Sequence, residues 1–310
     1  MNKEYLWVER YRPKQLGDCI LPERTKNLLR EYMDTNTIPN LLLTGTPGCG
    51  KGSLVNAIIH ETGADSIFIN CSVTGVDAVR TTIKNFASSV SMIDGDRKKV
   101  VVLDEIDGAT GSNNLQTALR SYMETFSSNA LFILTGNNSS KIIPALHSRC
   151  VTIDYNKEIN RKETPALMKA LMKRLEYILD EEKITYDRKV VAALIKRDFP
   201  DFRKVLNTMQ SYSSSGEIDS GILISTTTDV TELIGLMKNK DFDAVRAFVD
   251  EVTDTSGIYS ELYKQFGESL TKNQYAAVIC CLADYDYKDA FVSNPQLNLM
   301  ACLVEVMVDL

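Results

Sequence analysis

The feature that most constrains the fold is a glycine-rich segment that directly follows the apolar run Leu41-Leu42-Leu43 and precedes a helix-compatible sequence. The segment consists of Gly45, Thr46, Pro47, Gly48, Cys49, Gly50, Lys51, Gly52 and Ser53. Glycines at this spacing let backbone N–H groups converge on a polyphosphate, and the lysine adds a positive charge. A helix that follows points its positive end at the same anion. The segment therefore predicts a phosphate-binding loop on a strand-to-helix turn.

The composition is that of a globular protein in a reducing compartment. Of 310 residues, 44% are hydrophobic and 25% are charged, and no apolar stretch approaches the roughly 18 residues of a membrane-spanning helix. The seven cysteines form no C-x-x-C pair, and the only histidines are His60 and His147. These counts disfavour a zinc module, a disulfide framework and a histidine-based active site. We expect a cytoplasmic protein without a membrane partner.

Charge is distributed unevenly along the chain. The net charge is −6, but residues 1–160 are balanced, residues 161–204 carry +4 and residues 205–310 carry −10. An acidic segment is poorly suited to lie against nucleic-acid phosphates, so any DNA contact is expected from the first two segments.

Short apolar runs alternate with helix-length segments over the first half of the chain. The runs are rich in β-branched residues and comprise 41–44, 66–70, 99–104, 130–135 and 150–153. This alternation predicts an α/β fold with a doubly wound parallel sheet, which binds ligands at the carboxyl ends of its strands.

Helical patterns replace the strand signal from about residue 156. Apolar spacing predicts helices over 163–180 and 187–212, and helical patterns resume after the polar patch 225–228. We therefore expect three domains, which are an α/β core over 1–155, a small helical lid over 156–228 and an all-helical collar over 229–310.

Two carboxylates follow the predicted strand 99–104. Asp104 and Glu105 come directly after the apolar residues that precede them. An aspartate here can hold Mg²⁺, and the next glutamate can polarise a water for in-line attack on a terminal phosphate. Alone, the pair could be an ordinary acidic strand end. Together with the phosphate-binding loop, it indicates hydrolysis of a nucleoside triphosphate.

One residue of the loop departs from the common pattern G-x-x-x-x-G-K-[ST]. The position after the lysine usually carries a hydroxyl that holds Mg²⁺, and here it is Gly52. The next residue, Ser53, has a hydroxyl, but one helical step turns its side chain by about 100°. We expect Asp104 and Ser53 to be the protein groups nearest the metal, with a water in the missing position.

Two more polar residues adjoin predicted strands. Asn137 follows the run 130–135 and could bond the attacking water or the terminal phosphate, although Gly-Asn-Asn is also common turn chemistry. Arg149 precedes the run 150–153, and an isolated arginine is usually a solvated surface charge.

Four elements, in this order and spacing, resemble the clamp-loader branch of the AAA+ ATPases. They are Trp-Val-Glu-Arg-Tyr-Arg-Pro at 7–13, Asp104-Glu105, Ser148-Arg149-Cys150 and Pro-Asp-Phe-Arg-Lys at 200–204. The chain is most similar to the large subunits of T-even bacteriophage clamp loaders, and more distantly to replication factor C small subunits. The resemblance covers essentially the whole chain, and its Ser-Arg-Cys element is specific to clamp loaders.

The resemblance implies a role for each matching residue. Arg149 would be an arginine finger that reaches the γ-phosphate bound by a neighbouring subunit, which requires an oligomer. Arg203 would contact the γ-phosphate of the nucleotide bound by its own chain. The adenine side would be lined by Val8, Tyr11, Arg12 and Pro13. Ordinary packing of this N-terminal segment is the alternative.

A candidate DNA contact lies on another predicted helix. Arg80 and Lys84 are four residues apart and therefore share one helix face. The resemblance implies that this helix follows the template backbone through phosphate contacts that are independent of sequence. A solvated helix face is the alternative.

The sequence thus leads to one expected function and two alternatives. The expected function is ATP- and Mg²⁺-dependent loading of a ring-shaped sliding clamp onto primer-template DNA in replication. The chain would be the ATPase subunit of a pentamer with sister copies and one different subunit, in the cytoplasm of an infected bacterium if it is viral. Gly52 motivates the first alternative, a structural subunit that binds ATP but hydrolyses it poorly. The second is another AAA+ DNA-remodelling ATPase, which Ser148-Arg149-Cys150 disfavours.

Overall fold

The structure, a computed structural model, divides the chain into two units, residues 1–219 and 220–310. It describes residues 5–89, 99–108, 112–159, 162–213, 216–222, 230–252, 255, 257–266, 270, 272–289 and 291–310. Among the helices in these ranges, none is long and apolar enough to cross a membrane.

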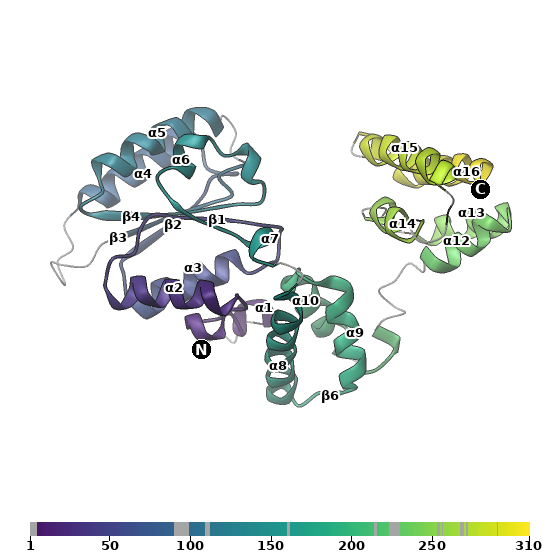
Figure 1. Ribbon diagram of the computed structural model, residues 1–310, viewed down its shortest axis with the longest axis horizontal. Helices are drawn as coiled ribbons and strands as arrows, with labels where there is room; N and C mark the ends of the chain where they lie inside the picture. The colour runs from purple at the N-terminus through teal and green to yellow at the C-terminus, as the bar shows by residue number, and fades with distance from the viewer. Residues whose placement is uncertain are drawn as a thin grey trace. The chain divides into compact units, whose positions relative to one another are not determined.

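A five-stranded parallel sheet forms the centre of the first unit (Figure 1). Its strands are β1 (Leu41–Thr44), β2 (Ser66–Asn70), β3 (Lys99–Asp104), β4 (Ala130–Gly136) and β5 (Val151–Asp154). They lie in the order β2-β3-β4-β1-β5, and every neighbouring pair is parallel. The predicted α/β fold with a doubly wound sheet is confirmed.

Helices cover both faces of this sheet, which explains its continuous apolar runs. The helices α4 (Val76–Ser88) and α5 (Ser112–Thr125) cover one face, and α2 (Glu23–Asp34) and α3 (Lys51–Thr62) cover the other (Figure 1). The side chains of successive β1 residues point alternately toward the helices on the two faces of the sheet. Leu42 packs in the cluster with α4 and α5, whereas Leu41 and Leu43 pack in the cluster with α3, so all three side chains are buried. The unit also contains the short helices α1 (Trp7–Arg10), η1 (Leu16–Asp18), η2 (Ser139–Lys141), α6 (Pro144–His147) and α7 (Tyr155–Glu158).

The strand order reverses between β1 and β4. The chain leaves β1 through α3 toward β2 at one edge of the sheet, and it leaves β4 through α6 toward β5 at the other edge. A doubly wound sheet binds its ligands at such a switch point. The glycine-rich loop follows β1 and Asn137 follows β4, so the fold places both there.

Three helices complete the first unit, and we refer to them as the lid. They are α8 (Thr164–Glu182), α9 (Arg188–Asp198) and α10 (Phe202–Tyr212). The stretch predicted as helical over 187–212 is therefore two helices. Pro200 ends the first because it lacks an N–H and disfavours a helical residue before it. Asp201 starts the second by accepting a hydrogen bond from Lys204 N at 2.9 Å.

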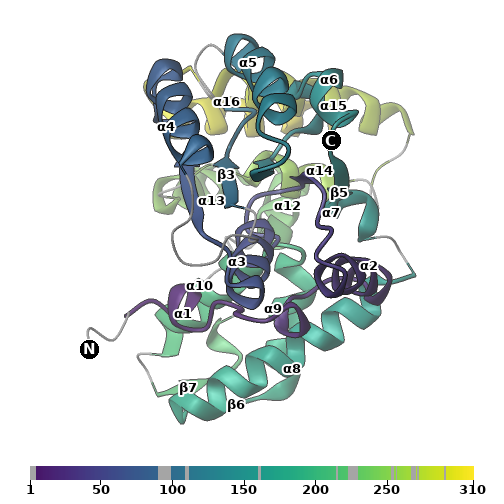
Figure 2. The same cartoon turned by 90° about the vertical axis from the view of Figure 1, so that its left-hand side faces the viewer.

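A pair of two-residue strands, β6 (Thr185–Tyr186) and β7 (Glu217–Ile218), lies beside the lid helices (Figure 2). The expectation that strands end before residue 156 was wrong here, because two residues are too few to show an alternating pattern.

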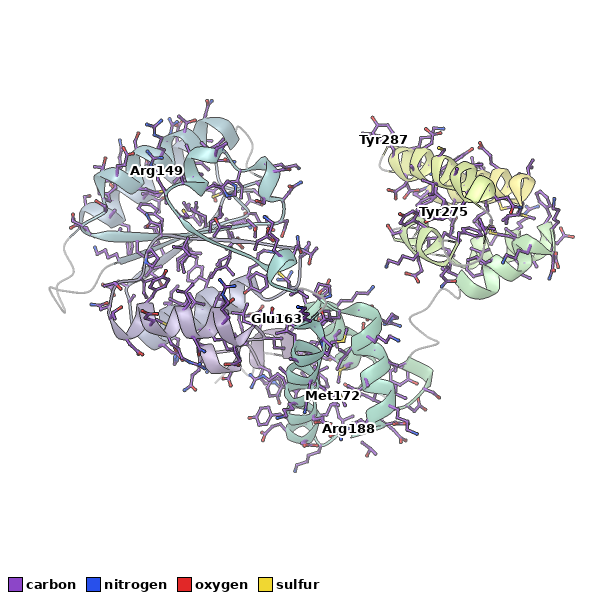
Figure 3. The ribbon with its side chains drawn as sticks, viewed as in Figure 1. Arg149, Glu163, Met172, Arg188, Tyr275 and Tyr287 are labelled. Carbon is purple, nitrogen blue, oxygen red and sulfur yellow. The ribbon has the colours of Figure 1, made fainter. Side chains whose placement is uncertain are left out.

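The regular secondary structure described in the second unit is all helical, as predicted. Its helices are α12 (Val230–Lys238), α13 (Phe242–Glu251), α14 (Ile258–Phe266), α15 (Lys272–Asp289) and α16 (Pro295–Asp309). Leu233, Leu262 and Leu303 belong to its core and are fully buried, whereas Tyr287 of α15 is exposed (Figure 3). The polar patch predicted as a boundary at 225–228 lies outside the described residues.

Candidate active site

The loop after β1 is shaped by three glycines with positive φ. Gly45 has φ 155°, Gly48 has 75° and Gly50 has 98°, a backbone that L side chains rarely adopt. The loop leads into α3, whose first N–H groups lack intrahelical partners and carry the positive end of the helix dipole. The arrangement fits an anionic polyphosphate.

Lys51 is held inside this loop. Its Nζ donates hydrogen bonds to Gly45 O (2.7 Å), Thr46 O (2.9 Å) and Asn137 Oδ1 (2.9 Å). Burial lowers the pKa of Lys51, and neighbouring acidic groups such as Asp104 oppose that change. Asn137 thus lies beside the loop, where its partner is Lys51, and its bond to the attacking water or the terminal phosphate stays a prediction.

The two carboxylates at the end of β3 have different partners. Asp104 accepts a hydrogen bond from Thr135 Oγ1 on β4. Glu105 has a left-handed backbone with φ 55°. Its Oε2 accepts from Ser72 Oγ at 2.7 Å and from Asn70 Nδ2 at 3.5 Å. Hydrogen bonds from the end of β2 therefore fix the direction of the Glu105 carboxylate.

The sequence-based prediction missed four residues that hold these groups, which are Asn70, Ser72, Asp107 and Thr135. Asp107 Oδ2 accepts hydrogen bonds from Asn137 N (3.1 Å) and Asn138 N (2.8 Å), so it fixes the loop after β4. All four lie at or just after the carboxyl end of a strand. Polar residues at the ends of adjacent strands were the signal that could have found them.

One pocket brings most of the predicted residues together. Those that line it are Val8, Tyr11, Arg12, Pro13, Pro47, Gly48, Gly50, Lys51, Gly52, Ser53, Asp104, Glu105, Asn137 and Arg203. Arg203 enters from the start of α10, and Leu171, Leu175 and Ile178 of α8 add an apolar wall. Gly45, Thr46 and Cys49 belong to the loop but do not line the pocket, and the Cys49 side chain is buried. The pocket therefore has a polar end at the loop and an apolar wall on the lid.

The residues at the polar end fit Mg²⁺ as well as phosphate. Ser53 and Asp104 line the same pocket and carry oxygen atoms in their side chains, and Mg²⁺ prefers one or two carboxylates together with phosphate oxygens and water. The two predicted metal residues therefore line one pocket, and their contact with Mg²⁺ stays a prediction.

The N-terminal wall of the pocket is fastened to the lid. Tyr11 Oη donates a hydrogen bond to Glu182 of α8, and Arg174 Nη2 donates to Tyr11 O at 3.0 Å. Trp7 N donates to Gln210 Oε1 of α10 at 2.9 Å. Burial, together with the bond to Glu182, raises the pKa of Tyr11 to about 12, so the phenol is neutral at physiological pH.

The start of α10 also rests on the phosphate-binding loop. A Cβ atom on Gly48 would lie only 1.8 Å from Asp201 Oδ1, and Phe202 N donates to Gly48 O at 3.1 Å. The absence of a side chain at Gly48 thus serves two purposes, since it permits both the positive φ and this close approach.

We expect Gly48→Ala to destabilise the ligand-free protein. The left-handed backbone costs a non-glycine residue roughly 1–2 kcal/mol, and the overlap with Asp201 adds to this cost. Thermal unfolding measures the change. Gly50→Ala is the matched control, since it shares the positive φ but would meet Phe202 at an ordinary 3.5 Å. Equal losses in the two variants would show that the Asp201 contact contributes nothing.

Arg149 does not line the pocket of its own chain. Its Nε donates to Glu124 Oε1 at 3.0 Å and its Nη1 donates to Ala145 O at 2.9 Å. Figure 3 shows Arg149 on the helical layer of α5 and α6, away from the lid helix that carries Met172. The bond with Arg149 lowers the pKa of Glu124, which holds the pair in its charged form.

Arg80 and Lys84 lie together on α4, also apart from the pocket. Arg80 Nη1 is 3.6 Å from Asp77 Oδ1, and Lys84 Nζ is 5.8 Å from the ring centroid of Tyr122 on α5. With Thr81 and Ser121 they line a shallow groove between α4 and α5. The predicted shared face is present, and its two cations are partly balanced by Asp77.

Known proteins share this architecture. The Holliday junction branch migration motor RuvB of Thermotoga maritima superposes with a TM-score of 0.54 at 19% identity, covering 83% of this chain and 91% of that one. The replication factor C small subunit of Methanothermobacter thermautotrophicus is 29% identical, with 97% of each chain covered. The first similarity concerns the fold alone, whereas the second extends over nearly the whole sequence.

The switch-point pocket, its phosphate-binding loop and its paired carboxylates define a P-loop ATPase. Residues 41–157 match the family model of the ATPases associated with various cellular activities (AAA). Residues 163–224 match the model of the AAA+ lid domain of sliding-clamp-loader large subunits. The sliding-clamp-loader large subunit of Enterobacteria phage T4 is 34% identical, with 100% of this chain and 98% of that protein covered. The chain therefore belongs to the clamp-loader family of AAA+ ATPases.

Proposed function

We propose that this chain is the ATPase subunit of a pentameric clamp loader, which uses ATP to place a ring-shaped sliding clamp on primer-template DNA during replication. The similarity to a sliding-clamp-loader large subunit over the whole chain is the observation that carries the proposal. The assembly would contain sister copies of this chain and one different subunit, and would act in the cytoplasm of an infected bacterium.

Within the site, each group has a proposed role in hydrolysis. The phosphate-binding loop and Lys51 hold the phosphates, and Arg203 contacts the γ-phosphate from the lid. Asp104 and Ser53 are the proposed protein side of the Mg²⁺ shell, and Mg²⁺ would offset phosphate charge. Glu105 polarises the attacking water, and Asn137 orients that water or the γ-phosphate. The adenine lies against the N-terminal segment through Val8, Tyr11 and Pro13. Arg12 belongs to the same segment, but its headgroup lies against Gly52 of the phosphate-binding loop.

Arg149 is proposed to act on the nucleotide of a neighbouring subunit. Arg149 does not line the pocket of its own chain, which supports this assignment, because any contact that it makes with a γ-phosphate must then cross a subunit interface. Hydrolysis then depends on correct assembly, which would tie ATP turnover to the closing of the clamp and the release of the loader.

The proposed domains are the core 1–155, the lid 156–228 and the collar 229–310. The last third of the chain, residues 205–310, carries a net charge of −10. Such a surface is repelled by DNA phosphates, which suits a collar that packs against sister subunits.

We expect Arg80→Ala and Lys84→Ala to weaken DNA stimulation of the ATPase without lowering the unstimulated rate. Each phosphate contact that is lost should reduce the slope of log affinity against log salt by about 0.7–0.9. DNA titrations over a range of salt concentrations measure this slope. Arg188→Ala is the matched control, because Arg188 is an exposed lid residue that pairs with Glu176 at 2.8 Å. If the variant with both substitutions has the same slope as wild type, Arg80 and Lys84 of α4 do not contact the DNA backbone.

The decisive experiment measures ATP hydrolysis by the chain co-purified with its partner subunit. Clamp and primer-template DNA together should stimulate turnover, and the mass of the assembly gives its composition. If DNA stimulates turnover equally with and without the clamp, the result would favour another AAA+ remodelling ATPase. Binding of ATP without single-turnover hydrolysis would favour the structural subunit that Gly52 suggests.

A further inference from the structure

The Arg12 side chain lies at the polar end of the pocket, against Gly52. An ideal Cβ atom built on Gly52 would lie 2.9 Å from Arg12 Nη2. Real Cβ atoms essentially never approach another heavy atom so closely, so a serine or threonine at 52 would have to displace the guanidinium. The arginine therefore takes the space of the side chain that the loop lacks.

The guanidinium is held in this position from two sides. With the Asn56 amide oxygen facing it, Asn56 Oδ1 accepts hydrogen bonds from Arg12 Nε at 2.7 Å and from Nη1 at 3.1 Å. Glu9 Oε2 accepts from Nη1 at 3.2 Å. Asn56 is one turn beyond Gly52 on the same face of α3. The Arg12 headgroup thus lies along the first turn of the helix whose N-terminus faces the phosphates.

The group beside the start of α3 carries a different charge here than in the usual phosphate-binding loop, which has a serine or threonine at position 52. A serine or threonine there contributes a neutral metal ligand, whereas Arg12 contributes a permanent positive charge with several N–H donors. The headgroup lines the same pocket as Lys51 and Asp104. A guanidinium repels a metal ion but binds phosphate oxygens directly through charge-assisted hydrogen bonds.

We propose that Arg12 and Gly52 form a matched pair, in which Arg12 replaces the missing hydroxyl as a positioning residue for the nucleotide phosphates. Nucleotide binding in this chain then depends less on Mg²⁺ than it does with a hydroxyl at position 52. This inference rests on the proposed function, because it concerns the same nucleotide site.

A double-mutant cycle on nucleotide affinity tests the pair. Affinity for a fluorescent ATP analogue is measured with Mg²⁺ and with a chelator, in wild type, Arg12→Ala, Gly52→Thr and the double variant. Arg12→Ala should lose about tenfold to a hundredfold in affinity without Mg²⁺, the range expected for a hydrogen bond to a charged group. Gly52→Thr should lose a similar amount by displacing the headgroup. The double variant should lose no more than either single variant, and its affinity should gain the most from Mg²⁺.

Two controls separate a phosphate role from simple anchoring of the N-terminal segment. Asn56→Ala removes the anchor but keeps the charge, so it should retain most of the Mg²⁺-free affinity. Arg10→Ala removes a neighbouring arginine that pairs with Glu182 at 3.0 Å, and it should leave the Mg²⁺ dependence unchanged. Thermal unfolding of each ligand-free variant verifies folding. If Arg12→Ala fails to fold, Arg12→Lys is measured instead. Lysine lacks the planar guanidinium with its several N–H donors, so the nucleotide affinity without Mg²⁺ should still be lower than in wild type.

The outcomes distinguish the inference from the function on which it rests. The matched pair would be overturned if the affinity losses of Arg12→Ala and Gly52→Thr added up in the double variant. It would also be overturned if Arg12→Ala bound nucleotide as tightly as wild type without Mg²⁺. Neither result would contradict the proposed ATPase function. A wild-type chain that binds no nucleotide under either condition would instead overturn the proposed function.

Discussion

Arg149→Ala is expected to lower DNA- and clamp-stimulated ATP turnover by about 10³- to 10⁵-fold, the effect of removing an arginine finger. Nucleotide affinity should change little, because Arg149 does not line the pocket of its own chain. Steady-state hydrolysis and binding of a fluorescent nucleotide, measured on the same preparation, separate the two effects.

Mixed assemblies test whether this arginine acts between subunits. Arg149→Ala subunits retain Glu105, and Glu105→Gln subunits retain Arg149. Neither should be active alone, but a mixture should recover part of the stimulated rate, because one neighbour completes the site of the other. Glu124→Gln is the control for the pairing seen in the structure, and it should keep turnover within a few-fold of wild type. Full stimulated turnover by Arg149→Ala alone would show that the assignment is wrong.

Glu105→Gln is expected to lower single-turnover hydrolysis by about 10²- to 10⁴-fold, the usual contribution of a general base. The amide keeps the size of the side chain and can still accept the hydrogen bond from Ser72 Oγ, so the fold and the nucleotide affinity should be preserved. Rapid-quench measurement with excess protein gives the chemical step directly.

The matched control for this variant is Glu31→Gln, which makes the same chemical change at an exposed position on α2. It should hydrolyse ATP at the wild-type rate. If Glu105→Gln also hydrolyses ATP at the wild-type rate, another group of the pocket must act as the base.

The core of the fold was predictable from the sequence because its central strands are buried on both faces. Strands such as 41–44 and 99–104 therefore appear as continuous apolar runs, and the structure places them at the predicted residues. The phosphate-binding loop was equally readable, since its glycines and lysine are consecutive. Apolar spacing did not divide 187–212 into two helices, because the spacing continues across Pro200 although the helical backbone cannot.

The remaining parts of the site depend on contacts between segments that are distant in the sequence. Ser72 with Glu105, Asp201 with Gly48 and Arg12 with Gly52 each join different elements of the first unit. The sequence by itself determined the sheet, the loop and the acidic strand end, because local pattern and backbone chemistry suffice for these. Only the tertiary structure decided where the Arg12 headgroup lies and which groups orient Glu105, because side-chain packing across the pocket sets both.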